Sequence, residues 1–178
     1  MTEPFTQPSL IFYDVANELI NNIADYFTEC CNPIPRVCVV PGEIAWDDCQ
    51  CDMLAASVQR WGLSDNFPSD GFTPGENRST PCNIPWIVGQ VVIQLIRCMP
   101  TPQGTEVAVP CSSLAAAAEQ LVFDAYVILT NVLATLCDLQ DRDVIVDYLI
   151  GEERSVGPQG DCGGVELTVS FAVNRVEY

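Results

Sequence analysis

The side chains of this sequence that could carry chemistry are carboxylates and thiols. The chain has 24 Asp and Glu, 10 Cys and no His, and its seven basic residues are all Arg because Lys is absent. It therefore lacks the usual acid/base group near neutral pH, the commonest metal ligand and the amine of Schiff-base chemistry. A cysteine nucleophile would also lack its usual histidine partner. We predict that the protein is not an enzyme, and we expect no catalytic residue and no cofactor.

Three carboxylates have the spacing of a hard-cation site. Asp47, Asp48 and Asp52 could offer oxygens to Mg²⁺, because a strand places Asp48 and Asp52 on the same side. In so acidic a chain, neighbouring carboxylates more often form a solvated face. A glycine-rich segment, 157–164, lacks the Lys-Ser/Thr ending of a phosphate-binding loop and precedes a strand. We interpret it as a turn that allows close backbone approach.

The ten cysteines have two interpretations. Their number suggests the disulfide framework of a small secreted protein, but this chain is longer and shows no export signal. Zinc is an alternative, yet no Cys-x-x-Cys pair and no His completes a set of ligands. We expect buried, reduced thiols and no metal. The cysteines are residues 30, 31, 38, 49, 51, 82, 98, 111, 137 and 162.

Length and composition indicate one folded domain. The chain has 178 residues, of which 48% are hydrophobic, so it is not a charge-expanded disordered sequence. Residues 1–8 have no signal-peptide pattern, and the longest apolar stretches, 86–96 and 121–136, are shorter than a bilayer span. The formal net charge of -17 repels polyanions such as DNA and anionic membranes. We expect a soluble intracellular product without membrane contact.

Hydrophobic periodicity predicts a helix followed by a sheet. Apolar residues recur every three or four positions over 9–30, which is typical of an amphipathic helix. The prolines at 33 and 35 end it, and 36–40 is a short strand. Residues 44–61 fit both patterns, and we predict a strand. The Pro- and Gly-rich stretch 62–85 is predicted to be a long exposed loop.

The second half is predicted to contain strands around a core helix. Alternation predicts a strand over 86–98 and another over 165–173. A wide apolar stripe predicts a helix over 113–137, capped by Ser112 or Ser113, and Asp141 could cap a shorter helical segment through Ile150. The order predicts a single-domain α+β fold in which a small mixed β-sheet packs against two or three helices.

Several motifs resemble a known family. They are the runs Val39-Val-Pro-Gly-Glu-Ile-Ala-Trp-Asp-Asp-Cys49, Gly89-Gln-Val-Val, Ile96-Arg-Cys-Met-Pro-Thr-Pro102, Asp124-Ala-Tyr126 and Gly157-Pro-Gln-Gly-Asp-Cys-Gly-Gly164. Together they are similar to neck and tail-terminator proteins of long-tailed phages of actinobacteria, over about residues 39–173. The resemblance implies an α+β subunit that assembles into a homohexameric ring, caps the tail tube and joins it to the head-side connector. Its motifs are structural and carry no catalytic meaning.

Three functions follow. The first is a ring-forming tail terminator of the virion, assembled in the host cytoplasm, whose partners are its own copies, the tail tube protein and the connector or stopper. DNA passes through such a ring without specific binding, which suits an acidic lumen. The second is a head-completion adaptor or stopper of the same neck. The third is a thiol-rich metal-binding or redox protein.

The ring hypothesis assigns three sets of residues. Head-to-tail contacts are expected to pair arginines of one subunit with acids of the next, and the arginines are Arg36, Arg97, Arg154 and Arg175. Phe67 and Phe72 are expected to anchor the long loop on a partner, although the loop could instead fold back on its own domain. The lumen is expected to be lined by Asp47, Asp48, Asp65, Asp70 and Glu76.

Overall fold

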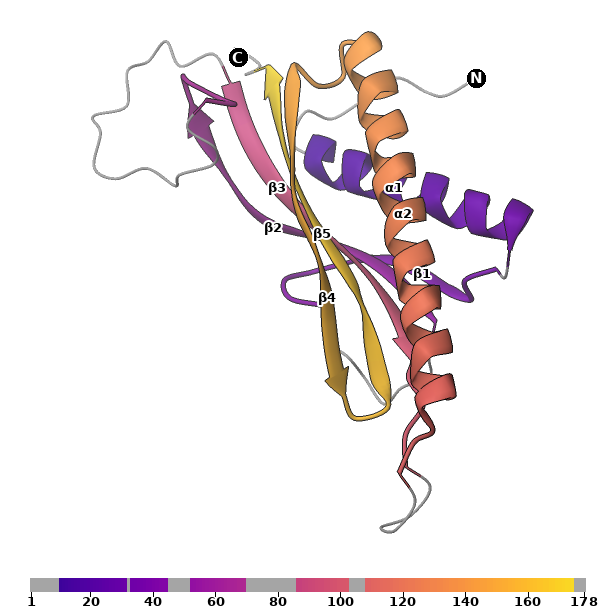
Figure 1. Ribbon diagram of the computed structural model, residues 1–178. Coiled ribbons are helices and arrows are strands. Elements are labelled where there is room, and N and C mark those ends of the chain that lie inside the picture. Colours follow the sequence, from indigo (N-terminus) through magenta and orange to yellow (C-terminus); the bar gives the residue numbers. More distant parts are fainter. Residues whose placement is uncertain (1–9, 32, 45–51, 70–85, 103–107, 175–178) are drawn as a thin grey trace.

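Five strands form one sheet, and both helices lie on the same face of it (Figure 1). The computed structural model describes residues 10–31, 33–44, 52–69, 86–102 and 108–174. This arrangement confirms the predicted single-domain α+β fold with a mixed sheet. In chain order the elements are α1 (Ile11–Cys30), β1 (Arg36–Val40), β2 (Met53–Ser64), β3 (Trp86–Cys98), α2 (Cys111–Asp141), β4 (Asp147–Gln159) and β5 (Cys162–Asn174).

The strands lie in the order β1-β2-β3-β5-β4. Only the β1–β2 pair is parallel among the described strands, and the other three pairs are antiparallel. The β3–β5 ladder continues over the full length of both strands, from Trp86 opposite Asn174 to Cys98 opposite Cys162. Strands β1 and β4 are the two edges of the sheet.

The predicted first helix is confirmed. Its apolar positions recur at helical spacing and face the sheet, so that Leu19, Ile23 and Phe27 have no exposed surface. Helix α1 packs on β1, β2 and β3, while α2 covers β4 and β5 and crosses α1 in front (Figure 1). The core between these layers also takes the predicted inward face of β5, namely Val165, Leu167, Val169, Phe171 and Val173.

Helix α2 is longer than predicted and begins differently. Pro110 is its N-cap, and neither Ser112 nor Ser113 caps it with a side chain, because the Pro110 carbonyl accepts the amides of Ser113 and Leu114. The predicted stripe is buried only in the second half of the helix, at Ile128, Val132 and Leu136. Leu114 and Ala118 are exposed, since the fully buried positions begin at Asp124.

The predicted short helix before Ile150 is wrong. Asp141 is the last residue of α2, and the chain enters the edge strand β4 at Asp147. Edge strand β4 has solvent on one side, so its sequence lacks the clean alternation of β5. The predicted strand over 44–61 is confirmed from Met53 onward and continues to Ser64, which shortens the predicted loop. Residues 45–51 and 70–85 lie outside the described residues.

Two glycines mark close approaches inside the sheet. A Cβ at Gly89 would lie 2.2 Å from the ring of Phe12, which itself packs on Phe171 at 5.3 Å between ring centroids. A Cβ at Gly164 would lie 2.1 Å from the backbone oxygen of Leu95 on the neighbouring strand. The predicted close approach in segment 157–164 is therefore confirmed, but Gly164 belongs to β5 and the turn lies at 160–161.

Candidate functional site

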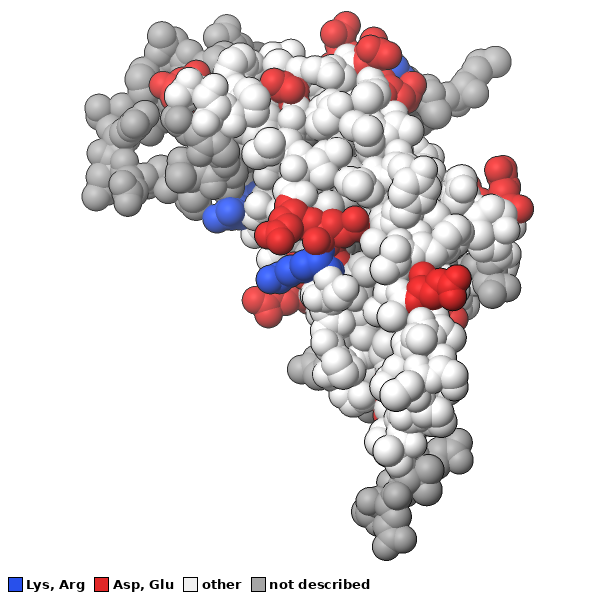
Figure 2. Space-filling view, in the orientation of Figure 1, with Lys and Arg blue, Asp and Glu red and all other residues white. Residues whose placement is uncertain are grey.

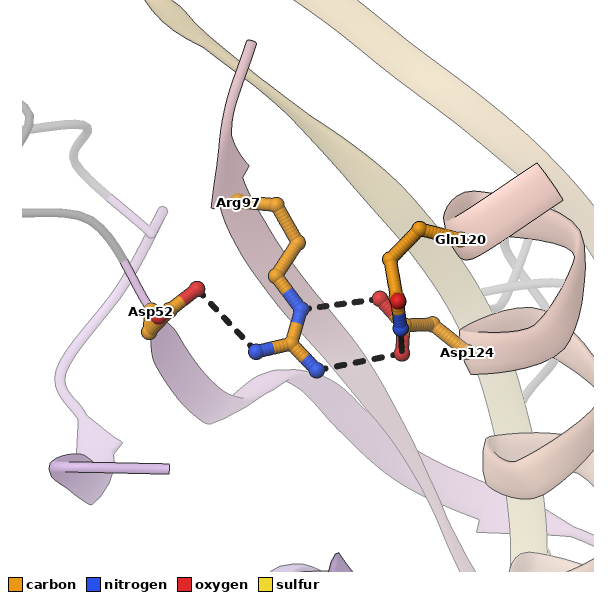
Figure 3. Close-up of polar contacts among 4 residues, drawn as sticks. All are labelled: Asp52, Arg97, Gln120 and Asp124. Atoms are coloured by element: carbon orange, nitrogen blue, oxygen red, sulfur yellow. Dashed lines mark hydrogen bonds and ion pairs between the residues drawn. The ribbon is translucent and has the colours of Figure 1, made fainter. Parts of the chain in front are cut away.

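The buried polar centre of the domain joins α2 to the sheet (Figure 3). Arg97, near the end of β3, donates from Nε to Asp124 Oδ2 at 2.8 Å and from Nη2 to Asp124 Oδ1 at 3.0 Å. Gln120, one turn earlier on α2, donates to the same carboxylate at 2.9 Å. Asp124 has no exposed surface. A bidentate pair of this kind fixes the rotation and the height of α2 over the sheet.

A second carboxylate completes the surroundings of Arg97. Asp52, just before β2, accepts from Arg97 Nη1 at 3.0 Å, and its backbone has a φ of 68°, in the left-handed region. The guanidinium carbon also lies 5.3 Å from the centre of the Phe27 ring on α1. Arg97 therefore connects α1, α2 and the start of β2 through one side chain.

The electrostatics of Arg97 indicate a structural role. Burial lowers the pKa of Arg97, but the hydrogen bonds and charges of Asp124 and then of Asp52 raise it, and the net pKa lies above its ordinary value. The guanidinium stays charged and its donors are already engaged by two carboxylates of the same chain. Because the described hydrogen bonds of Arg97 all join parts of its own domain, we assign the cluster to domain architecture.

The arginines predicted for the subunit interface have different surroundings. Arg97 is 9% exposed and pairs with acids of its own chain, so its assignment to an intersubunit ion pair is wrong. Arg154 on β4 pairs with Glu166 of β5 at 2.6 Å and keeps an exposed side chain. Arg36 lies half-buried at the start of edge strand β1, and its interface role stays a prediction. Arg175 lies outside the described residues.

The predicted lumen and docking residues fall largely in undescribed segments. Asp65 is exposed directly after β2, and its role in the lumen stays a prediction. Phe67 is 5% exposed and packs with Val88 and Ala172 on the sheet face opposite the helices. Its burial favours the alternative in which this end of the loop folds back on its own domain, and Phe67 is corrected from partner anchor to core residue. The remaining members, Asp47, Asp48, Asp70, Phe72 and Glu76, lie outside the described residues.

The expectation of ten buried, reduced thiols is wrong. Cys30 and Cys31 form a disulfide at the exposed end of α1, and Cys98 and Cys162 each take part in a disulfide. Cys111 and Cys137 are free and exposed, whereas Cys38 is free and half-buried. Cys98 and Cys162 lie opposite each other at the ends of β3 and β5, a proximity that the sequence does not show, whereas the Cys30–Cys31 bond joins neighbours in the sequence. Residues 49, 51 and 82 lie outside the described residues.

Native thiol labelling should distinguish the free cysteines. We expect Cys111 and Cys137 to react with a maleimide in the folded protein, and Cys38 to react more slowly because β1 and its neighbours cover it. The measurement is intact mass after timed labelling, with Cys111→Ser and Cys137→Ser each removing one fast adduct. A substitution at either position that leaves the number of fast adducts unchanged would contradict the assignment.

Glu153 on β4 is the described side chain with a buried, unpaired oxygen. Its Oε1 has no hydrogen-bond partner among the described residues, and burial raises the pKa of Glu153 above its ordinary value. A raised pKa in the folded state means that ionisation costs stability. That cost is absent below the pKa of the unfolded chain and is complete above the folded pKa.

Glu153→Gln should therefore stabilise the protein at pH 7. We expect a gain below about 1 kcal/mol, since the group is only half-buried. The gain should disappear below about pH 4, where the glutamate is protonated in both states. Urea unfolding at both pH values is the measurement, and Glu152→Gln at the exposed neighbouring position is the control. An equal effect of Glu153→Gln at both pH values would contradict the burial argument.

The outer face of α2 is uncovered and apolar. Four apolar side chains lie on one line along the helix, at intervals of four, three and four residues. We call them the α2 seam. They are Val122, Tyr126, Leu129 and Leu133, and their exposed fractions are 71%, 66%, 37% and 45%. Between Glu119 and Asp138 the single charged residue of the helix is the buried Asp124. Figure 2 shows the middle of α2 as an uncharged surface with acidic side chains beyond it. The apolar stripe predicted for this helix did not include these four residues, which lie beside it on the helix surface.

Comparison with protein-family models and with curated protein sequences gives no match to this chain. The described residues hold no group of three His, Cys, Asp or Glu side chains placed to bind a metal ion. By length and composition α2 could cross a membrane, a property that core helices of soluble proteins share. Its inner face is occupied by the sheet and by the Arg97–Asp124 pair. The α2 seam and the two sheet edges are thus the candidate functional surfaces of the described domain.

Proposed function

We propose that this protein is a structural subunit of a phage neck, which assembles into a homo-oligomeric, hexameric ring, terminates the tail tube and joins it to the head-side connector. The observation that carries the proposal is the combination of two sheet edges and an apolar helix face that the described residues leave uncovered in one small domain. Such surfaces are expected of a subunit completed by neighbours. The choice of a phage neck as the assembly comes from the sequence motifs that resemble neck and tail-terminator proteins.

The open edges favour a ring. Strand β4 offers an outer edge along 13 residues, and β1 offers one along five at the other side of the sheet. A head-to-tail contact between two different surfaces, repeated around an axis, closes into a ring and leaves no edge open. Two of the predicted interface arginines lie on these edge strands, Arg36 on β1 and Arg154 on β4.

The charge of the chain suits a conduit. A net charge of -17 with seven arginines, several of them paired internally, gives a surface that repels phosphates. DNA would pass through an acidic opening without forming the counterion-releasing contacts that hold it in basic grooves. The protein would act by shape and self-association, with no catalytic step and no cofactor.

Two other functions remain as proposals. A head-completion adaptor or stopper of the same neck shares the fold, size and acidity, and differs in binding the portal side before the tail side. The exposed Cys30–Cys31 disulfide is the observation that favours a redox or thiol function. Stoichiometric zinc, or a disulfide that reduces and reforms without loss of fold, would support that alternative.

The proposed function is tested by mass and by order of binding. Native mass spectrometry of the purified chain should give a discrete closed oligomer built from rings of six subunits. Incubation with isolated tail tubes should cap one end of each tube before any connector is added. A subunit that binds the connector first would transfer the assignment to the adaptor, and a monomer at all concentrations, with and without tail tubes, would overturn both.

A further inference from the structure

The α2 seam has the features of a helix–helix interface. Its four side chains keep the four-three-four spacing at which one helix packs against another, and the seam is exposed along about 17 Å of helix. The next position on the same line toward the N-terminus is Glu119. The next toward the C-terminus, Leu136, already turns into the core. The seam therefore has a defined length and a charged side chain at one end only.

We propose that the α2 seam binds the α2 seam of a second copy of this chain, with the two helices antiparallel about a two-fold axis. In this arrangement Val122 faces Leu133 of the second copy, and Tyr126 faces Leu129 of the second copy. The two-fold axis repeats each of these residue pairs once. The seam is uncharged and self-complementary in this register. In a homo-oligomer, the partner at the highest local concentration is another copy of the same chain. To that extent the inference rests on the proposed function.

Charge selects the antiparallel orientation. A parallel pair would place Glu119 directly against Glu119 of the second copy within the packing layer, where like charges destabilise. The antiparallel pair separates the two carboxylates by about 25 Å along the helix axis, well beyond the screening length of about 8 Å at physiological salt. Helix α2 carries no basic residue that could neutralise Glu119 in a parallel pair.

The chemistry of the seam disfavours a lipid surface. Helix α2 itself contains no Lys or Arg, the Arg142 that follows it is already paired with Glu18 and Asp138, and the whole chain is strongly acidic, whereas interfacial helices carry several free basic residues. The two-fold contact is also separate from ring closure. An isologous contact uses the same patch on both copies, whereas a ring of repeated head-to-tail contacts uses two different surfaces. Seam contacts between two six-subunit rings would therefore give a particle of twelve subunits.

Cross-linking in defined register tests the proposal. In a background with Cys111→Ser and Cys137→Ser, an affinity-tagged Val122→Cys chain is mixed with an untagged Leu133→Cys chain and treated with a short thiol cross-linker. The mixture should give a tagged–untagged dimer, while each variant alone should give at least tenfold less, because its own positions are about 16 Å apart in the antiparallel pair. Strong cross-linking of Val122→Cys alone would overturn the antiparallel register.

Disruption of the seam supplies the second readout. Leu129→Glu should weaken the dimer at least tenfold in sedimentation velocity, whereas Ala134→Glu, an exposed position about 100° around the same helix, should leave it unchanged. Circular dichroism confirms that both variants fold. Equal dimerisation of both variants, or binding of the wild-type chain to neutral phosphatidylcholine vesicles in place of dimerisation, would overturn the proposal. Loss of cross-linking with rings intact would refute the seam contact alone, and cross-linked pairs without rings would refute the ring alone.

Discussion

Arg97→Met should lower the free energy of unfolding by about 3–5 kcal/mol, because it leaves the Asp124 carboxylate buried without its positive partner. The loss should exceed that of Arg154→Met, whose ion pair with Glu166 lies at the surface and contributes below about 1 kcal/mol. Urea denaturation followed by circular dichroism measures both. Equal losses of unfolding free energy in the two variants would contradict the view that Arg97 neutralises a buried carboxylate.

The double variant Arg97→Met, Asp124→Leu separates the loss of a partner from the loss of the side chain. We expect it to recover more than half of the stability lost in Arg97→Met, since no uncompensated charge remains. Amide exchange in the N-terminal half of α2 is the second readout. If stability recovers while exchange there becomes faster, the Arg97–Asp124 pair is the element that fixes the position of the helix. A double variant as unstable as the single one would contradict this account.

Gly164→Ala should destabilise the domain by about 3 kcal/mol, the upper range for overpacking, because the new methyl group would meet the Leu95 backbone oxygen 2.1 Å away. The neighbouring Gly163→Ala is the matched control. A Cβ there lies 2.8 Å from the flexible Met99 side chain, which can move aside, so the loss should be much smaller. Thermal unfolding of both variants is the measurement, and a larger loss for Gly163→Ala would contradict the described β3–β5 register.

The order of elements could largely be predicted from the sequence because two periodicities dominate. The helical spacing of Leu19, Ile23 and Phe27 and the strict alternation of β5 each have one buried face, and burial of that face is what the pattern records. Strand β4 was missed because an edge strand with solvent on one side has no such requirement. The early helix start at Cys111 was missed because the N-cap residue is Pro110, whose side chain has no group that could cap the helix.

The polar centre and the free surfaces could not be derived in the same way. Arg97 and Asp124 stand 27 residues apart and meet only because α2 lies over the end of β3, so a charged residue near a strand end was assigned to the outside. Helix α2 has more apolar positions than the sheet can cover, and hydrophobicity alone does not divide them into a core face and the seam. The oxidised state of Cys98 and Cys162 could not be predicted for the same reason, since the two residues lie opposite each other only in the folded β3–β5 ladder.

Electron microscopy of the purified chain tests the central claim, self-assembly into a ring, most directly. Class averages of negatively stained particles, recorded over a range of protein concentrations and with isolated tail tubes present, should show closed rings with a central opening and rotational symmetry, expected to be six-fold, and rings seated on one end of the tubes. Particles that remain single domains or open chains under all of these conditions, with tube ends left bare, would contradict the account.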